Sequence, residues 1–286
     1  MRGVADPSDP MNSLLTVELN ITELCNRTCE FCPRADSEIY PNRKLMMAAA
    51  TVEKAVADLG SFGYKGRLSF SGYGEPLLHP GLSEFVGLCR RALPGNTIEV
   101  NTNGDYLSVE NTRALFESGL TQLYINLYDG ESQRAPFISM MTRAGVEASR
   151  YRLRDHWVGA SKEFGLNLNN RSGMVDLKIE GVRRPAELVG LPCYYPFYRL
   201  MLDWNGDMLF CSNDWGREIV VGNIHQRHVK ELWLSAQMTE IRRRLGHGDR
   251  RMKPCGTCNV VGTLYGRPSV DLLMSHDQDS SEGKNP

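Results

Sequence analysis

The stretch Cys25-Asn26-Arg27-Thr28-Cys29-Glu30-Phe31-Cys32 places three cysteines within eight residues, separated by three and then two residues. Three thiolates can bind three irons of a four-iron cluster and leave the fourth iron open, as a catalytic metal site requires. A zinc site would need a fourth ligand, and no further cysteine lies near this stretch. The spacing therefore predicts one [4Fe–4S] cluster bound by Cys25, Cys29 and Cys32.

Strand and helix patterns alternate along the chain on either side of this stretch. Alternating apolar and polar residues over 14–21 predict a strand that leads directly into the cysteine loop. The same reasoning predicts further strands over 67–71, 97–101, 122–127, 151–157 and 166–169, and helices over 47–59, 82–93 and 111–118. Such alternation favours an α/β fold with parallel strands and crossover helices, an open or partial (β/α) barrel whose ligands bind at the carboxyl ends of the strands.

Composition limits the classes of partner and location. The chain has 286 residues, 41% of them hydrophobic, and a formal net charge of −1. This charge argues against nonspecific nucleic-acid binding and against a basic membrane-binding patch. We see no apolar run of membrane-spanning length and no signal-peptide pattern, and clustered cysteines suit a reducing compartment. We therefore expect a cytoplasmic protein that binds neither nucleic acid nor membrane.

Four later cysteines form a second group around a predicted hairpin. Residues 198–204 and 207–211 flank Asn205-Gly206, a strong two-residue turn signal, and a helical pattern follows over 228–245. The group consists of Cys193, Cys211, Cys255 and Cys258. Four thiolates can bind a structural zinc ion or a second [4Fe–4S] cluster, and the spacing alone leaves both possibilities open. The eighth cysteine, Cys89, lies in a predicted helix and is expected to be a small buried apolar side chain.

The first cysteine stretch resembles the signature of the radical S-adenosylmethionine (SAM) superfamily, including the aromatic Phe31 before the last cysteine. The resemblance implies that SAM binds the open iron and that a SAM-derived radical abstracts a hydrogen atom from the substrate. It further implies that Phe31 belongs to the cofactor site, that Gly74-Glu75-Pro76 contacts the methionine end of SAM, and that Asn103 contacts its ribose.

The second cysteine group resembles the twitch module, a shortened SPASM extension that carries one auxiliary [4Fe–4S] cluster. Val221-Gly-Asn-Ile224 and Leu232-Trp233, between the hairpin and the final Cys-x-x-Cys, support this resemblance. The expected organisation is a disordered N-terminus over 1–13, a partial (β/α)6-type radical SAM barrel over 14–185, a twitch module of hairpin plus helix over 186–274, and a disordered tail over 275–286.

Five motifs stand out along the chain: Cys25-Asn-Arg-Thr-Cys29, Tyr73-Gly-Glu-Pro-Leu-Leu78, Thr102-Asn-Gly-Asp105, Asn170-Arg-Ser-Gly173 and Gly222-Asn-Ile224. Together they resemble radical SAM enzymes of aminoglycoside biosynthesis, which include dehydrogenases and epimerases. The resemblance implies an aminoglycoside or aminocyclitol substrate, a reductant of the flavodoxin or ferredoxin type, and Arg171 as a catalytic residue near the reacting hydroxyl. Tyr73 is a second catalytic candidate. Asn213 replaces a glutamate of the family's dehydrogenases, so Asp214 is either a substitute carboxylate for a cationic substrate or a solvated loop residue.

The cysteine count bears on the reaction. An epimerase needs a cysteine that returns a hydrogen atom, whereas a dehydrogenase needs an acceptor for a second electron, such as an auxiliary cluster. If all four late cysteines bind that cluster, only Cys89 remains as a donor. We therefore predict two-electron oxidation of a secondary alcohol, with the auxiliary cluster as electron acceptor, and keep a radical epimerase with a cysteine hydrogen donor as the alternative.

Overall fold

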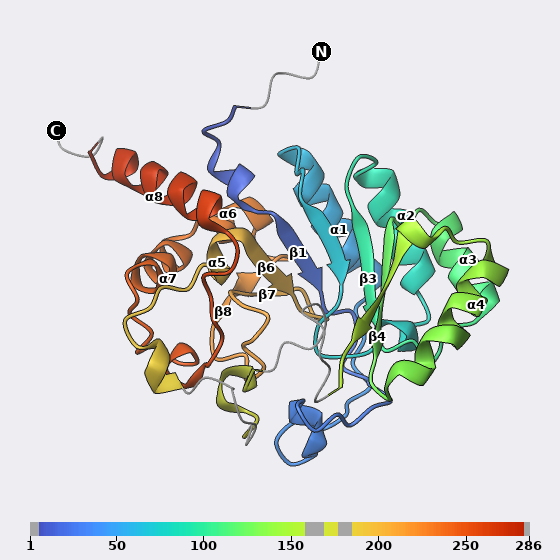
Figure 1. The fold of residues 1–286 in the computed structure, drawn as a ribbon. Helices are drawn as coiled ribbons and strands as arrows, with labels where there is room; N and C mark the ends of the chain where they lie inside the picture. Colours follow the sequence, from blue (N-terminus) through green and yellow to red (C-terminus); the bar gives the residue numbers. More distant parts are fainter. Residues whose placement is uncertain (1–5, 158–168, 177–184, 283–286) are drawn as a thin grey trace.

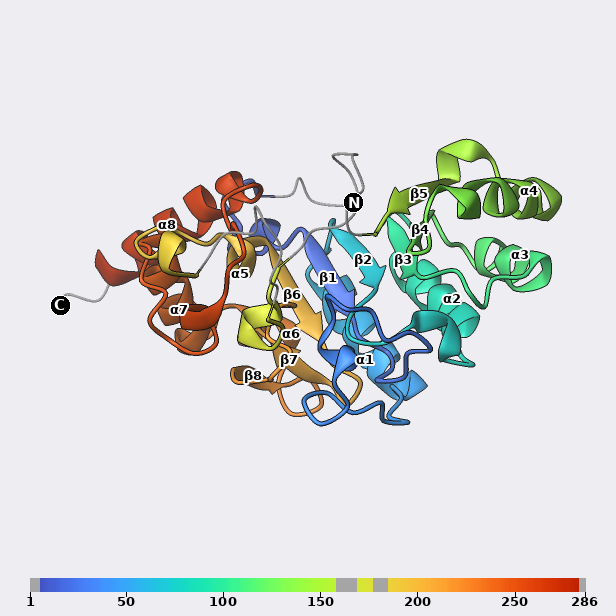
Figure 2. The ribbon, with the colours of Figure 1, turned by 60° about the horizontal axis from the view of Figure 1, so that its bottom comes forward.

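The computed structural model describes residues 6–157, 169–176 and 185–282. Their strands form one sheet in the order β5-β4-β3-β2-β1-β6-β7-β8, which Figure 2 shows in succession from β8 at the left to β5 at the right. Every neighbouring pair from β5 to β6 is parallel, and β7 and β8 join antiparallel. The bounds are β1 Thr16–Leu19, β2 Arg67–Phe70, β3 Ile98–Thr102, β4 Gln122–Leu127, β5 Tyr151–Asp155, β6 Arg199–Leu202, β7 Asp207–Leu209 and β8 Val220–Asn223.

Helices cover the outer side of this sheet. Helices α1 to α4 follow one another along the parallel strands, and α5 to α8 gather at the other end of the molecule (Figure 1). The apolar core, with fully buried Val17, Leu68 and Val100 from three adjacent strands, lies between strands and helices. The helices are α1 Ala49–Ser61, α2 Leu82–Ala92, α3 Val109–Glu117, α4 Arg134–Ala144, α5 Tyr195–Tyr198, α6 Val229–Trp233, α7 Ala236–Gly246 and α8 Arg267–Glu282.

The predicted α/β fold with a partial barrel is confirmed, because β5, β4, β3, β2, β1 and β6 run parallel in one sheet. The predicted hairpin around Asn205-Gly206 is also present as β6 and β7. Since β6 pairs with β1, the segment that carries the late cysteines continues the barrel sheet. Side chains of the two cysteine groups are therefore mounted on one continuous framework.

Some predicted boundaries were wrong. The first helix, predicted over 47–59, starts at Ala49, continues through Gly60 and ends at Ser61, with Phe62 as its C-cap. The stretch predicted as one helix over 228–245 is two helices, since Ser235 caps α7 by accepting a hydrogen bond from the Met238 amide. The strand expected over 151–157 ends at Asp155, and most of the one expected over 166–169 lies outside the described residues.

Both chain ends have more structure than the sequence suggested. The 3₁₀ turn η1 (Pro10–Ser13) buries Met11, and α8 continues to Glu282. The two elements contact each other, and the Ser269 hydroxyl donates a hydrogen bond to the Ser13 carbonyl at 2.9 Å. Val270 and Leu273, which precede the predicted tail, are buried and contribute apolar contacts to α8.

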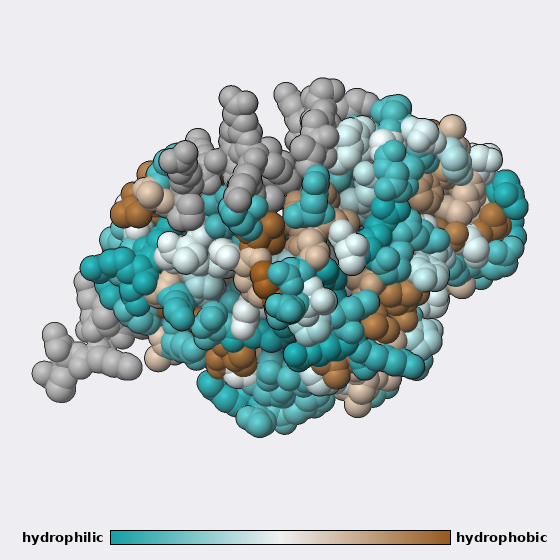
Figure 3. Space-filling model, turned by 90° about the horizontal axis from the view of Figure 1, so that it is seen from below, coloured by the Kyte–Doolittle hydropathy of each residue, from teal (hydrophilic) through white to brown (hydrophobic). Residues whose placement is uncertain are grey.

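The carboxyl ends of the parallel strands face the lower side of Figure 1, where the cysteine loop crosses them. Viewed from that side, the surface is mainly hydrophilic, with hydrophobic side chains in small groups (Figure 3). Among the described helices, none combines the length and the apolar composition needed to cross a membrane.

Candidate active site

The three early thiols line one cavity of about 170 Å³ at the carboxyl ends of the central strands. Asn42 brackets the first of them: its Oδ1 accepts from the Cys25 amide at 3.0 Å and its Nδ2 donates to the Cys25 carbonyl at 2.9 Å. Cys29 and Cys32 lie in a turn, in which the Cys32 amide donates a hydrogen bond to the Cys29 carbonyl at 2.9 Å. The loop thus presents Cys25, Cys29 and Cys32 to a common space, as their spacing predicted.

The chemistry of these thiols fits an iron–sulfur cluster. Burial raises the pKa of Cys25 and Cys32 above the ordinary thiol value and that of Cys29 to about 12. A buried thiolate needs a nearby cation, and bound iron supplies it. Among the described residues no three metal-ligand side chains converge as a single ion would require. A four-iron cluster needs no such convergence, because each thiolate binds a different iron.

The Gly74-Glu75-Pro76 segment lies against the cysteine loop through its backbone. The Glu75 amide donates to the Leu24 carbonyl at 2.7 Å, and a Cβ on Gly74 would lie 2.0 Å from the Thr22 carbonyl oxygen. The Glu75 carboxylate is buried and accepts hydrogen bonds from the Thr102 hydroxyl and the Asn103 amide at 2.6 and 2.8 Å. Its side chain therefore fixes the end of β3. Gly74 and Glu75 line the cavity, whereas Pro76 is not among its lining residues.

Asn103 and Phe31 both line the cavity. The Asn103 Nδ2 donates to Asn26 Oδ1 at 2.8 Å, so Asn103 connects the end of β3 to the cysteine loop. Phe31 stacks on Tyr128, with ring centroids 6.0 Å apart and planes 15° apart. The pair forms an apolar wall beside the thiols.

Arg27 is a site residue that the sequence did not single out. Its guanidinium forms hydrogen bonds of 2.6 to 2.9 Å with the carboxylates of Asp105, after β3, and Asp129, after β4. It also lies 5.1 Å from the Tyr128 ring centroid. Arg27 thereby ties the cysteine loop to two strand ends, and its position between two cysteines of the motif was the signal available in the sequence.

Tyr73 lines the same cavity, but its hydroxyl is engaged elsewhere. The hydroxyl donates to the Asp214 carbonyl at 2.8 Å, and the ring packs against Trp215 with centroids 4.5 Å apart. Burial raises its pKa well above the ordinary tyrosine value. Asp214 is itself fully buried, and its carboxylate accepts the Glu218 and Ile219 amides at 3.0 and 2.9 Å. Asp214 is therefore neither a solvated loop residue nor a carboxylate available to a cationic substrate, because its buried carboxylate stabilises a turn.

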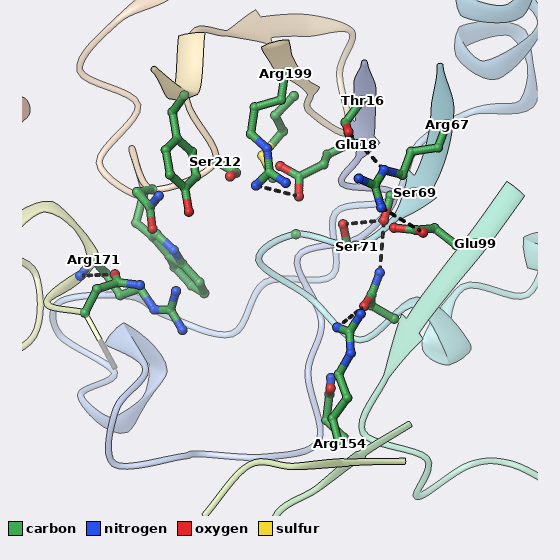
Figure 4. A pocket seen from close by; sticks show the side chains of 18 of the residues that line it. Thr16, Glu18, Arg67, Ser69, Ser71, Glu99, Arg154, Arg171, Arg199 and Ser212 are labelled. Atoms are coloured by element: carbon green, nitrogen blue, oxygen red, sulfur yellow. Dashed lines mark hydrogen bonds and ion pairs between the residues drawn. The ribbon is translucent and has the colours of Figure 1, made fainter. Parts of the chain in front are cut away.

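A second and larger cavity, of about 370 Å³, adjoins the first inside the barrel, and Figure 4 shows Arg171 and Arg199 among its lining residues. Both cavities are lined by Asn126, His156 and Arg171. The lining of the larger cavity is polar, and several buried atoms in it have no hydrogen-bond partner within the part of the chain that the structure describes. These atoms are Glu18 Oε2, Asn126 Oδ1, His156 Nδ1, Arg171 Nε and Arg199 Nε. Buried polar groups are normally paired, so this concentration indicates a site for a ligand rich in polar groups.

The sequence did not single out the strand residues of this cavity. Glu18, Arg67 and Glu99 lie on β1, β2 and β3, where their side chains line the barrel interior. The available signal was a glutamate inside each of the short strands β1 and β3, whereas Arg67 is the exposed first residue of β2. Glutamates are costly to bury without a functional or pairing reason.

Arg171 is positioned by the loop that carries the last two cysteines. Arg171 and Ser172 have φ angles of +47° and +56°, a conformation that costs about 1 to 2 kcal/mol per non-glycine residue. Hydrogen bonds from Asn170 Nδ2 to the Thr257 carbonyl (2.6 Å), from the Asn259 amide to Asn170 Oδ1 (3.1 Å) and from Thr257 Oγ1 to the Ser172 carbonyl (2.7 Å) hold the turn. The unusual backbone is thus fixed by the Cys255–Cys258 segment.

The four late thiols line a third, mostly apolar cavity: Cys193, Cys211, Cys255 and Cys258. Backbone amides approach two of the sulfurs, Asn213 N to Cys211 Sγ at 3.4 Å and Val260 N to Cys258 Sγ at 3.5 Å. Burial raises the pKa of Cys193 to about 11. Amide-to-sulfur hydrogen bonds and buried thiols fit cluster ligands.

Two side chains join this thiol-lined cavity to the polar one. Tyr195 and Asn213 line both. The polar cavity therefore lies between the two cysteine groups, adjoining each. Cys89 takes no part, since it is fully buried in α2 within the apolar core, as predicted.

Comparison with known proteins agrees with this geometry. A family model of the Radical SAM superfamily matches residues 19–153, and a SPASM model, described as an iron–sulfur cluster-binding domain, matches residues 193–259. The S-adenosyl-L-methionine-dependent 2-deoxy-scyllo-inosamine dehydrogenase of Niallia circulans is 29% identical over 254 residues, covering 88% of this chain and 95% of that protein.

Two further similarities differ in extent. The crystal structure of BtrN in complex with AdoMet and 2-DOIA superposes with a TM-score of 0.75 and 26% identity, covering 89% of this chain and 96% of the other. A GTP 3′,8-cyclase of Chlorobaculum tepidum is 33% identical over 132 residues, covering 46% of this chain and only 37% of the cyclase. The dehydrogenase similarity therefore extends over both cysteine groups, whereas the cyclase similarity is partial.

Proposed function

Because the chain belongs to the radical SAM superfamily and carries a SPASM-type cluster-binding domain, we propose that it oxidises a secondary alcohol of an aminocyclitol or aminosugar by two electrons. The substrate class comes from the dehydrogenase relative, which matches over nearly its whole length. The reaction would belong to aminoglycoside antibiotic biosynthesis. When bound, the cluster with SAM supplies hydrogen-atom abstraction, and the auxiliary cluster supplies an electron acceptor.

The cysteine groups have separate tasks in this proposal. Cys25, Cys29 and Cys32 hold the SAM-binding cluster. The space for SAM beside it is bounded by Phe31, Gly74, Glu75 and Asn103. The auxiliary cluster takes the four late cysteines as ligands: Cys193, Cys211, Cys255 and Cys258.

Arg171 and Tyr73 act differently on the substrate site. Arg171 contributes a guanidinium that lies at the boundary of both cavities, and its buried Nε has no hydrogen-bond partner among the described residues. It can therefore orient the reacting hydroxyl. Tyr73 lines only the SAM cavity, and its hydroxyl holds the Asp214 carbonyl. We therefore assign Tyr73 the role of positioning the segment after β7.

The observation that carries the proposal is the place of the polar cavity between the two thiol-lined cavities. It shares Arg171 and Asn126 with the first, and Tyr195 and Asn213 with the other. A hydrogen atom can leave the substrate on one side, and the second electron has only a short distance to travel on the other. The hydroxyl proton leaves with the second electron and passes to solvent, which completes the balance.

Epimerisation is less well supported. An epimerase needs a thiol that faces the substrate and returns a hydrogen atom. Cys89 lies fully buried in the apolar core and lines neither cavity, and the other seven cysteines fall into the two groups. A cluster ligand would therefore have to serve as donor.

The test is anaerobic turnover of the reconstituted protein with 2-deoxy-scyllo-inosamine and related aminosugars in D₂O. The proposal predicts a product that has lost two hydrogen atoms, with one 5′-deoxyadenosine formed for each product. A product of inverted configuration that has gained one solvent deuterium in place of hydrogen would establish epimerisation instead.

We also propose a cytoplasmic location and a one-electron reductant of the flavodoxin or ferredoxin type. All eight cysteines are free thiols in the structure, which suits a reducing compartment. Reduction by purified flavodoxin, compared with dithionite, would test the partner. SAM cleavage with dithionite but with no flavodoxin or ferredoxin would contradict this part of the proposal.

A further inference from the structure

We propose that Arg217 is a positioning residue that couples the SAM-binding cysteine loop to one wall of the polar cavity. This wall is the segment 211–217, which begins at Cys211 and contributes Asn213 and Trp215 to the cavity lining. Loading of the SAM-binding cluster thereby orders the place where the substrate is oxidised. The inference rests on the function proposed above, and it gives a task to an arginine that is not among the lining residues of that cavity.

The Arg217 guanidinium joins two strand ends to the cysteine loop. Its Nε donates a hydrogen bond to Asp203 Oδ2 at 2.5 Å, directly after β6, and its Nη2 donates to Glu23 Oε1, between β1 and the first cysteine. Its Nη1 donates to the Tyr40 hydroxyl at 2.9 Å, and this hydroxyl donates to Glu23 Oε2 at 2.8 Å. Hydrogen bonds to charged groups are the strong ones, so one side chain holds three segments together.

The carboxylates that Arg217 binds are buried, with side-chain exposures of 4% for Glu23 and 1% for Asp203. Removal of one partner from a buried ion pair leaves an uncompensated charge, which is strongly unfavourable. Asn20 Nδ2 donates to both carboxylates, at 3.2 Å to Glu23 and at 2.7 Å to Asp203. Arg217 has a φ of +53°, which is unfavourable for a residue with a side chain. These contacts therefore fix the end of the segment 211–217.

The same network reaches the ligands of the SAM-binding cluster through Arg34, which lines the SAM cavity. Arg34 Nη2 lies 3.9 Å from Glu23 Oε2, and Arg34 Nη1 donates to Asn42 Oδ1 at 3.1 Å. The same Asn42 oxygen accepts the Cys25 amide at 3.0 Å. A continuous series of contacts thus runs from Cys25 through Asn42, Arg34 and Glu23 to Arg217.

Aromatic packing carries these contacts on to the polar cavity. The Trp215 ring packs against Tyr73 and Tyr40, with ring centroids 4.5 and 5.0 Å apart, and Cys32 packs against the same cluster. Trp215 lines both the SAM cavity and the polar cavity. The position of the cysteine loop therefore bears directly on the indole that stands between the two cavities.

The cysteine loop is the part of this arrangement that depends most on a bound cluster. Between β1 and α1 the only helical element is the short 3₁₀ turn η2 (Pro33–Ala35), so bound iron supplies much of the order of this stretch. Glu23 and Tyr40, two of the partners of Arg217, both lie in it. Ordering of the loop is therefore passed to the segment 211–217, and linkage makes the coupling reciprocal.

The experiment is anaerobic hydrogen–deuterium exchange of the reconstituted protein, read at hydrogen-bonded amides of this segment and its end. The reporters are the amides of Asp214, Trp215, Arg217, Glu218 and Ile219. The protein with both clusters is compared with the variant Cys25→Ala/Cys29→Ala/Cys32→Ala, in which only the auxiliary cluster can form. Weakening of one charge-assisted contact predicts roughly tenfold faster exchange in this variant. Unchanged exchange at the reporters would overturn the proposal.

Substitutions locate the coupling at Arg217. Arg217→Gln should raise the exchange by a similar factor, and the three cysteine substitutions should then raise it no further. Arg217→Lys should restore only part of the protection, because lysine lacks the forked donors. Arg243→Gln, which breaks an exposed pair with Glu240, should leave the exchange unchanged. Additive effects of Arg217→Gln and the cysteine substitutions would contradict the proposal.

Tyr40→Phe is the milder test if Arg217→Gln, which leaves two buried carboxylates without their cation, does not fold. It removes the hydroxyl that Arg217 and Glu23 share, so the reporters should exchange roughly fivefold faster. In the cysteine-free background of the loop, Tyr40→Phe should change the exchange little. An equal effect of Tyr40→Phe in both backgrounds would contradict the proposal.

The outcomes separate this inference from the proposed function. Faster exchange without the SAM-binding cluster, with no oxidised product from the unaltered protein, would support the coupling and count against alcohol oxidation. Oxidation of an aminocyclitol by a protein whose reporter amides do not respond to that cluster would support the oxidation and refute the coupling.

Discussion

Asn170→Ala is expected to weaken substrate binding while leaving both iron sites intact. The substitution removes two hydrogen bonds, from Asn170 Nδ2 to the Thr257 carbonyl and from the Asn259 amide to Asn170 Oδ1. Each contributes about 1 kcal/mol net, so the turn that carries Arg171 loses about 2 kcal/mol of support. Because Arg171 and Ser172 adopt left-handed backbone angles, the turn should then leave this conformation. The binding-competent fraction would fall roughly 30-fold.

The assay is anaerobic titration of the SAM-loaded protein with whichever aminosugar or aminocyclitol probe binds most tightly. We expect the Kd to rise by up to roughly 30-fold in Asn170→Ala. In Thr257→Val, which loses the hydrogen bond that the Thr257 hydroxyl shares between the Ser172 and Pro254 carbonyls, the Kd should rise roughly fivefold. Iron content and SAM affinity should match the unaltered protein. An unchanged Kd, or a loss of iron equal to the loss of binding, would refute the idea that this contact positions Arg171.

Three further substitutions test other parts of the account. Gly262→Ala would place a Cβ 2.3 Å from Cys193 Sγ and so displace this ligand of the auxiliary cluster. The iron content should then fall from about eight to about four atoms per chain. A content of about eight irons would contradict the assignment of Cys193 as a cluster ligand. Arg27→Ala should weaken SAM binding by about tenfold, because the hydrogen bonds to Asp105 after β3 and Asp129 after β4 are lost. Arg27→Lys should restore little of this affinity, since lysine lacks the forked donors of a guanidinium. An unchanged SAM affinity in a titration of Arg27→Ala would refute this role of Arg27. His156 has a folded pKa of about 4 against 6.5 unfolded, so its unfolded form binds the proton first as pH falls. Urea unfolding of the cluster-free protein should therefore show about 1 to 2 kcal/mol less stability at pH 5 than at pH 7, a difference that His156→Gln reduces by that amount.

The cysteine groups and the fold could be predicted because local sequence determines them. The three early cysteines lie within one short segment, so their spacing alone predicts that they bind together. Alternating strands and helices specify a parallel sheet, in which the carboxyl ends of the strands lie at the same edge. Residues that follow strands, such as Asn103, therefore lie where they were expected. The segment after residue 157 was harder, since its strand pattern is weak and contacts distant in sequence, such as Asn170 with Asn259, determine its turn.

The remaining site residues depend on pairings that only the folded chain reveals. Glu18 and Arg199 are 181 positions apart and meet because β1 pairs with β6. Tyr73 and Asp214 looked equally available for catalysis in the sequence, yet each is used in packing and hydrogen bonding. Local motifs locate a site, whereas long-range partners decide which polar side chains remain accessible to a ligand.

The central claim is that the polar cavity between the two cysteine groups serves a two-electron oxidation that requires both. The most direct measurement is turnover of Cys255→Ala with a substrate deuterated at the reacting carbon, followed by analysis of 5′-deoxyadenosine and product. The account predicts that deuterium still appears in 5′-deoxyadenosine, while the oxidised product falls to background. Oxidised product at the rate of the unaltered protein would contradict the claim.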